Sequence, residues 1–192
     1  MHLPVSTISA ARLLKYLLLL TLAVMVGGIC RIELIYANLS TPVESLPYHV
    51  AAYCGLAFSS IFSFLLTGLV VAIPFLVFAA FSQRVSYAQY EEGVLKLLLI
   101  LIANEVFKAG LTGLFLPGEV QAMIPDGTLA SALTTTLSAQ IGHNADAVAL
   151  AIGILLMTYY WFSIRAAGVK PALILLASFA TWSATALLNS LS

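Results

Sequence analysis

The chain has 192 residues, of which 61% are hydrophobic and only 8% are charged, and its mean hydropathy is +1.05. A soluble domain carries roughly a quarter charged residues, so this chain lacks the polar side chains needed to cover a water-exposed surface. Its eight basic residues balance its eight acidic residues, which excludes the positive excess that a nucleic-acid partner requires. We therefore expect an all-α, polytopic transmembrane helical bundle with the lipid bilayer as its solvent.

Five apolar segments predict five membrane-spanning helices, at about residues 13–30, 50–82, 93–116, 147–164 and 172–188. Each segment is long enough to cross a hydrocarbon layer of roughly 30 Å. The chain has no internal repeat and no low-complexity tract, so residues 1–192 are expected to form a single membrane domain. The second segment is longer than one crossing needs. We expect it to be tilted, extended beyond the membrane or broken, with Pro74 as the place for a kink.

Polar segments are expected to connect these spans. Arg31 opens the first loop, and residues 83–92 form the second, in which Ser86 and Gln89 have the spacing of a helix capping box. A third loop is expected from Pro117 to Asp146, and its part over residues 129–141 is compatible with a short surface helix.

Basic residues concentrate on one side of this predicted topology. That side collects Arg12, Lys15, Arg84, Lys96, Arg165 and Lys170, whereas only Arg31 clearly falls on the other. Because cytoplasmic loops are enriched in Lys and Arg, we expect a cytoplasmic N-terminus and an external C-terminus. The first span is interpreted as retained rather than cleaved, and the expected location is the inner (cytoplasmic) membrane of a bacterium.

Three polar residues lie inside the third predicted span: Asn104, Glu105 and Lys108. An ionisable group at membrane depth costs at least a few kcal/mol, so a function is the first hypothesis. Glu105 and Lys108 are three positions apart and can share one helix face. They predict either a proton or ion relay, or a polar socket for a partner helix. The alternative is a mutually neutralising pair near the outer boundary, with Lys108 reaching the interface and Asn104 bonded to a neighbouring helix.

Two catalytic patterns have partial counterparts in the chain. Glu91-Glu92-Gly93-Val94-Leu95-Lys96 resembles the EExxxR signature of CAAX-type prenyl endopeptidases, but lysine replaces arginine and no FxxxH motif is present. Cys54 and His143 resemble the outer-face thiol and imidazole of exosortase-like transpeptidases, whereas the arginine of that family is missing around Asn104. We therefore assign no catalytic, cofactor-binding or metal-binding residue, and expect neither enzyme activity nor a cofactor.

From Arg84 onward the chain resembles the Yip family of small polytopic membrane proteins. The segment Val85-Ser86-Tyr87-Ala88-Gln89-Tyr90 leads into a central apolar helix at Leu97-Leu98-Leu99, and a short basic turn from Arg165 to Lys170 joins the last two spans. The resemblance covers about half of the chain. It implies five spans, a cytoplasmic N-terminus and a non-enzymatic protein that binds other membrane proteins, such as an accessory subunit beside an ABC-type exporter.

Three functions are compatible with these features. The first is a non-enzymatic subunit or scaffold of an inner-membrane complex serving an exporter or secretion system, with other integral membrane proteins as partners. Gly110 and Gly113 would let a helix of such a partner, or of the chain itself, approach closely. The second is a small transporter or proton pathway that uses Glu105. The third is a membrane cysteine transpeptidase that uses Cys54 and His143.

Overall fold

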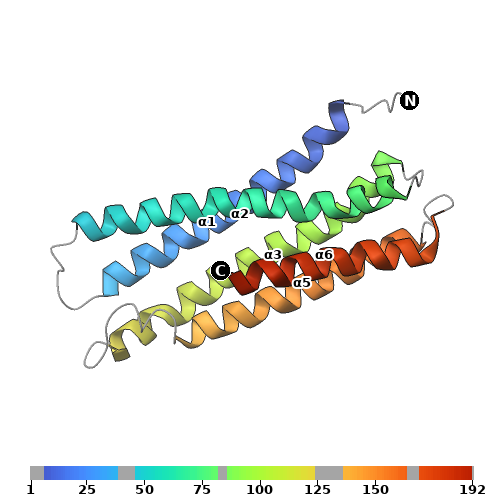
Figure 1. The fold of residues 1–192 in the computed structure, drawn as a ribbon. Coiled ribbons are helices and arrows are strands. Elements are labelled where there is room, and N and C mark those ends of the chain that lie inside the picture. Colours follow the sequence, from blue (N-terminus) through green and yellow to red (C-terminus); the bar gives the residue numbers. More distant parts are fainter. Residues whose placement is uncertain (1–6, 39–45, 82–85, 124–135, 164–168, 192) are drawn as a thin grey trace.

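The computed structural model describes residues 7–38, 46–81, 86–123, 136–163 and 169–191. These residues form five helices and no strand: α1 (Thr7–Asn38), α2 (Leu46–Ala80), α3 (Tyr87–Met123), α5 (Leu137–Ser163) and α6 (Pro171–Leu191). The predicted all-α fold is confirmed, and each predicted span coincides with one of the helices. Successive helices run in alternating directions (Figure 1).

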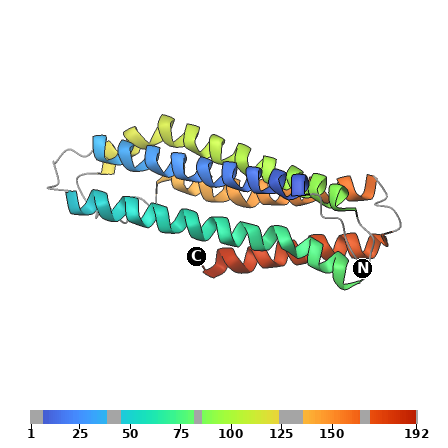
Figure 2. The same cartoon turned by 90° about the horizontal axis from the view of Figure 1, so that it is seen from above.

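The helices pack in two layers. One layer contains α1, α3 and α5, and the other contains α2 and α6 (Figure 2). Within the first layer α3 lies in the middle, because its most extensive contacts are with α5 on one side and α1 on the other. The residues at the middle of α3 are therefore flanked by two other helices.

Three segments are long and apolar enough to cross a membrane, namely Ala11–Ala37, Val50–Ala80 and Ala139–Ser163. A shorter apolar segment, Pro171–Ala186, lies in α6. The chain is therefore a helical bundle suited to a membrane. The crossing of the bilayer by α3 and α6, and the sidedness of the two termini, stay predictions.

The first residues of two predicted loops are instead helical. α1 continues past Arg31 to Asn38, and α3 continues through Pro117 to Met123. The predicted boundaries were wrong because Ile35 of α1 packs against the fully buried Leu116 of α3. The two helices thus continue to bury apolar surface beyond the predicted spans, and such packing stabilises the additional helical turns.

The third predicted loop is also shorter than expected. α5 begins at Leu137, so His143 and Asp146 belong to this helix and not to a loop. Residues 124–135, which include most of the possible surface helix over 129–141, lie outside the described part of the chain.

The predicted capping box at the start of α3 is confirmed. The Ser86 hydroxyl accepts a hydrogen bond from the backbone N–H of Gln89 at 3.2 Å, and the Gln89 side-chain oxygen accepts one from the backbone N–H of Ser86 at 3.3 Å. This reciprocal pair is a capping box, and it satisfies backbone donors that the start of α3 would otherwise leave open. α6 begins at Pro171, a residue that suits the first helical position.

The long second span is one continuous helix that contains a buried Pro74. Proline removes the N–H that would bond the carbonyl of Val70 and so weakens this turn of α2. At the next residue, the Val71 carbonyl accepts a hydrogen bond from the Tyr90 hydroxyl of α3 at 2.6 Å. Burial raises the pKa of Tyr90, so the phenol remains a donor. Pro74 thus lies beside a contact between α2 and α3, and the expected kink at this proline stays a prediction.

The start of α3 also contacts α5 through a tryptophan. Trp161 is fully buried, packs edge-on against Phe78 with ring centroids 5.2 Å apart, and donates its indole N–H to the Gln89 carbonyl at 3.1 Å. Gly93 leaves room for the indole ring, because a Cβ atom at this position would overlap Trp161. We call Phe78, Tyr90 and Trp161 the aromatic end of the bundle.

Between the aromatic end and the middle of α3 the interior is apolar. We call this region the apolar core, and it is formed by Val94, Leu97, Leu98, Leu150, Ile154 and Met157. All six side chains are at most 8% exposed. Asn104 is the first buried polar residue on α3 beyond this core.

Candidate functional site

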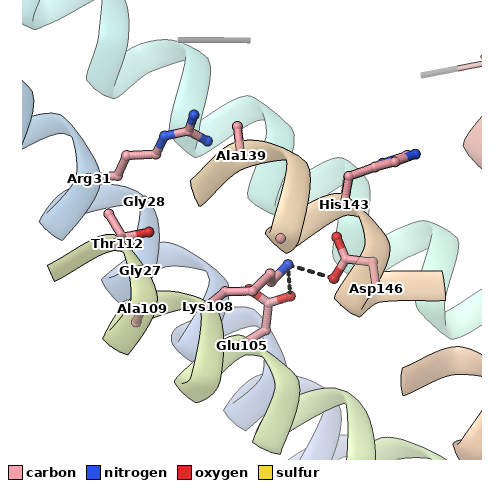
Figure 3. Close-up of a pocket in the computed structure, with 11 residues that line it drawn as sticks. Gly27, Gly28, Arg31, Glu105, Lys108, Ala109, Thr112, Ala139, His143 and Asp146 are labelled. Carbon is pink, nitrogen blue, oxygen red and sulfur yellow. Dashed lines mark ion pairs between the residues drawn. The ribbon is translucent and has the colours of Figure 1, made fainter. Parts of the chain in front are cut away.

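A cluster of four polar side chains joins α3 to α5 past the apolar core. Lys108 Nζ lies 2.6 Å from Glu105 Oε1 on its own helix and 2.8 Å from Asp146 Oδ1 on α5 (Figure 3). Asn104 Nδ2 donates a hydrogen bond to the same Asp146 oxygen at 2.6 Å. Lys108 thus lies between two carboxylates, and Asp146 accepts bonds from two residues of α3. These four residues form the α3–α5 polar cluster.

The sequence identified three of the four members. Asn104, Glu105 and Lys108 come together as the spacing predicted, and Asn104 bonds to a neighbouring helix as one of the two interpretations expected. Asp146 was missed because it was assigned to a loop. The available signal was the segment 137–146, which contains no proline and a single glycine and can therefore extend a helix backwards from the apolar run that begins at Ala147.

A pocket of about 300 Å³ adjoins this cluster, between α1, α3 and α5. Its polar lining residues are Arg31, Glu105, Lys108, Thr112, His143 and Asp146, and Figure 3 shows their side chains. The remaining lining residues are Gly27, Gly28, Ala109, Ala139 and Gly142. These residues have no side chain or only a methyl group, so all three helices leave space beside the charged groups.

The pocket lies at one end of the predicted first span, residues 13–30. Leu13 to Cys30 rises about 27 Å at 1.5 Å per residue, which matches a hydrocarbon layer of roughly 30 Å. Just before this segment, Arg12 pairs with Glu92 of α3 at 2.8 Å, and just after it Arg31 lines the pocket. The Arg12–Glu92 pair and the pocket are therefore separated by about one hydrocarbon thickness.

The catalytic patterns considered above do not assemble. Cys54 is exposed on α2 and does not line the pocket, whereas His143 does. In Figure 3 the His143 ring points away from the pair between Lys108 and Asp146. Glu91 lies about 21 Å from Glu105 along α3, so it is remote from His143 as well. Among the described residues, no group of three or more His, Cys, Asp and Glu side chains is placed to hold a metal ion.

Gly110 and Gly113 are on the outward side of α3. A Cβ atom at either glycine would meet nothing within 4 Å, so neither packs against another described helix of the chain. Their neighbours on this face, Val106, Phe107 and Leu114, are also exposed. We call these five residues the outward face of α3, and it is a surface that self-packing leaves open.

The small residues of α6 behave differently, because they pack inside the bundle. Ala177 and Thr181 are fully buried, and the Ser178 hydroxyl lies 2.6 Å from the Thr158 hydroxyl of α5. These positions contribute to the fold and are not available to a partner.

The fold and this site define a helical membrane bundle with a mixed-charge pocket at one end. Comparison with protein-family models, with curated proteins and with solved structures finds no match to the chain.

Proposed function

We propose that this chain is a non-enzymatic subunit or scaffold of a larger inner-membrane complex, with its N-terminus in the cytoplasm and its C-terminus outside. The outward face of α3 carries this proposal. Two glycines in an otherwise exposed apolar face let the backbone of a second helix approach closely, which is how helices associate where lipid removes the hydrophobic driving force. The resemblance to the Yip family supports the same role and favours an exporter or secretion system as the partner.

The apolar core argues against a transport role for Glu105. An ion or proton crossing the bundle would need polar groups or water along its path. Between Glu105 and the aromatic end, the contact between α3 and α5 offers the six apolar side chains of the core. The hydroxyls of Thr158 and Ser178 bond to each other where α5 meets α6. Glu105 itself is paired with Lys108. This arrangement favours a structural role, in which the cluster holds α3 and α5 together, rather than a relay through the membrane.

A cysteine transpeptidase is also less well supported. Its thiol needs a base or a cation close by to become a thiolate, whereas Cys54 lies outside the pocket that His143 lines. Full function of Cys54→Ser in the source organism would exclude this role.

The subunit proposal is tested by extracting the protein gently from its native membrane at native expression and measuring the mass and composition of the particle. We expect a second polypeptide in a fixed ratio to the chain. Gly110→Leu should release this polypeptide because the longer side chain blocks close helix approach. Gly55→Leu is the matched control, since Gly55 of α2 is equally open, and it should retain the partner. A particle that contains only one or more copies of this chain would refute the proposal.

A further inference from the structure

The pocket has unused acceptors on its α3–α5 side. Lys108 contacts Glu105 through Oε1 and Asp146 through Oδ1, and Asn104 uses the same Asp146 oxygen. Within the described residues, the second oxygen of each carboxylate makes neither a hydrogen bond nor an ion pair. Two carboxylates and one ammonium leave this wall with one net negative charge. It is therefore suited to a cation that carries N–H donors.

Thr112 adds a further polar atom to the pocket, one helical turn beyond Lys108 and toward Arg31 (Figure 3). Elsewhere in the bundle, the hydroxyls of Thr21, Thr158, Thr181 and Thr185 each donate to the carbonyl four residues earlier. The Thr112 hydroxyl lines the pocket and makes no such bond to any described residue. A half-buried hydroxyl normally has a partner, and a ligand in the pocket would supply one.

The α1 side of the pocket carries the opposite charge. Arg31 lines the pocket from α1, apart from the pair between Lys108 and Asp146 (Figure 3), and it makes one or more further contacts of its own. A guanidinium presents several N–H donors in a plane and recognises carboxylate and phosphate groups. The pocket thus has an anionic wall and a cationic wall, and its volume of about 300 Å³ falls at the small end of ligand sites.

From this charge arrangement we propose that the pocket binds a zwitterion, with a primary ammonium group at Glu105 and Asp146 and an oxyanion at Arg31. Two sources offer this chemistry. Because the pocket lies about one hydrocarbon thickness from the Arg12–Glu92 pair, we expect it at the level of the lipid headgroups, where phosphatidylethanolamine reaches it. A water-soluble phosphoethanolamine or amino acid carries the same pair of charges.

Binding is measured on the delipidated full-length protein by native mass spectrometry, with phosphatidylethanolamine and phosphatidylcholine of identical acyl chains. Choline carries the same charge but has no N–H donor, so we expect a preference for ethanolamine of about tenfold, the factor that one charge-assisted hydrogen bond provides. Free phosphoethanolamine is titrated in parallel. Binding of the free compound identifies a water-borne ligand, and binding of the lipid alone identifies a headgroup site; either result supports the proposal.

Two variants localise the binding. Asp146→Asn removes an acceptor charge, and Ala139→Leu fills the pocket without changing any charge. Each should weaken binding about tenfold or more. Glu92→Gln removes a carboxylate at the opposite end of the bundle and should leave binding unchanged. Equal retention of choline and ethanolamine lipids, binding that survives Ala139→Leu in the folded protein, or no binding of either probe would overturn the proposal.

Discussion

Lys108 of α3 and Asp146 of α5 form an ion pair at 2.8 Å, at the end of the apolar core through which much of the contact between these two helices runs. The Lys108 side chain is 24% exposed and that of Asp146 is 44% exposed, so the pair is only partly shielded from solvent. A partly shielded ion pair that also contacts a second carboxylate and an amide stabilises the fold more than a surface salt bridge does. Its loss leaves a charge without its partner.

Asp146→Asn should therefore destabilise the protein measurably. We expect a loss of about 1–2 kcal/mol in the free energy of unfolding, because Lys108 keeps Glu105 as a partner and asparagine can still accept a bond from Asn104. Thermal unfolding in a mild detergent measures the effect. Glu92→Gln is the control, since its exposed pair with Arg12 should contribute at most about 1 kcal/mol. If the two variants unfold at the same temperature, the cluster does not hold α3 to α5.

Gly93→Ala should destabilise the aromatic end. The added methyl group would overlap the buried indole of Trp161, and such overpacking costs about 1–3 kcal/mol. Gly110→Ala in the same helix meets open space and should be neutral or slightly stabilising. Gly93→Ala should cost less stability in the Trp161→Phe background than it does in the wild type. Equal stability of Gly93→Ala and Gly110→Ala would contradict the close packing of Gly93 against Trp161.

Tyr90→Phe tests the contact beside Pro74. Loss of the hydrogen bond to the Val71 carbonyl should cost about 1 kcal/mol. Burial raises the pKa of Tyr90 above the ordinary tyrosine value of 10.0, so the folded state holds this proton more tightly than the unfolded state. The resulting stability is complete below about pH 10 and declines as the pH rises further. Unfolding temperatures between pH 8 and 11 should fall more steeply for the wild type than for Tyr90→Phe. Parallel curves would contradict a buried phenol.

Glu105→Gln separates the subunit role from the transport alternative. Because the apolar core offers no polar path, reconstituted wild-type protein should not raise proton flux above that of empty vesicles, and Glu105→Gln should behave identically. A pH-sensitive dye inside the vesicles reports the flux. A flux that appears with the wild type and disappears with Glu105→Gln would favour the relay.

The helical spans were predictable because apolar runs in a nearly uncharged chain have few other stable structures in lipid. The helix ends predicted at Arg31 and Pro117 were wrong, although a charged residue and a proline normally mark the end of a helix. Sequence periodicity does not reveal that Ile35 and Leu116 meet, and this tertiary contact extends both helices.

The α3–α5 polar cluster was predictable only in part. Glu105 and Lys108 are local neighbours on one helix, so their spacing was sufficient. Asp146 is distant in sequence and joins the cluster only because α5 packs along α3. The pocket was not predicted, since it depends on small residues of three helices meeting at one level beside charged groups.

We expect the charged pocket to open to one side of the membrane and the apolar core to close it from the other side. Cysteine accessibility tests this directly, with Cys30→Ser and Cys54→Ser as the background. A membrane-impermeant maleimide is applied to either side of sealed vesicles that carry Thr112→Cys, Leu98→Cys or, as a control at the aromatic end, Lys170→Cys. We predict that Thr112→Cys reacts only from the side opposite to Lys170→Cys, and that Leu98→Cys reacts from neither side. Reaction of Leu98→Cys, or of Thr112→Cys from both sides, would contradict the account.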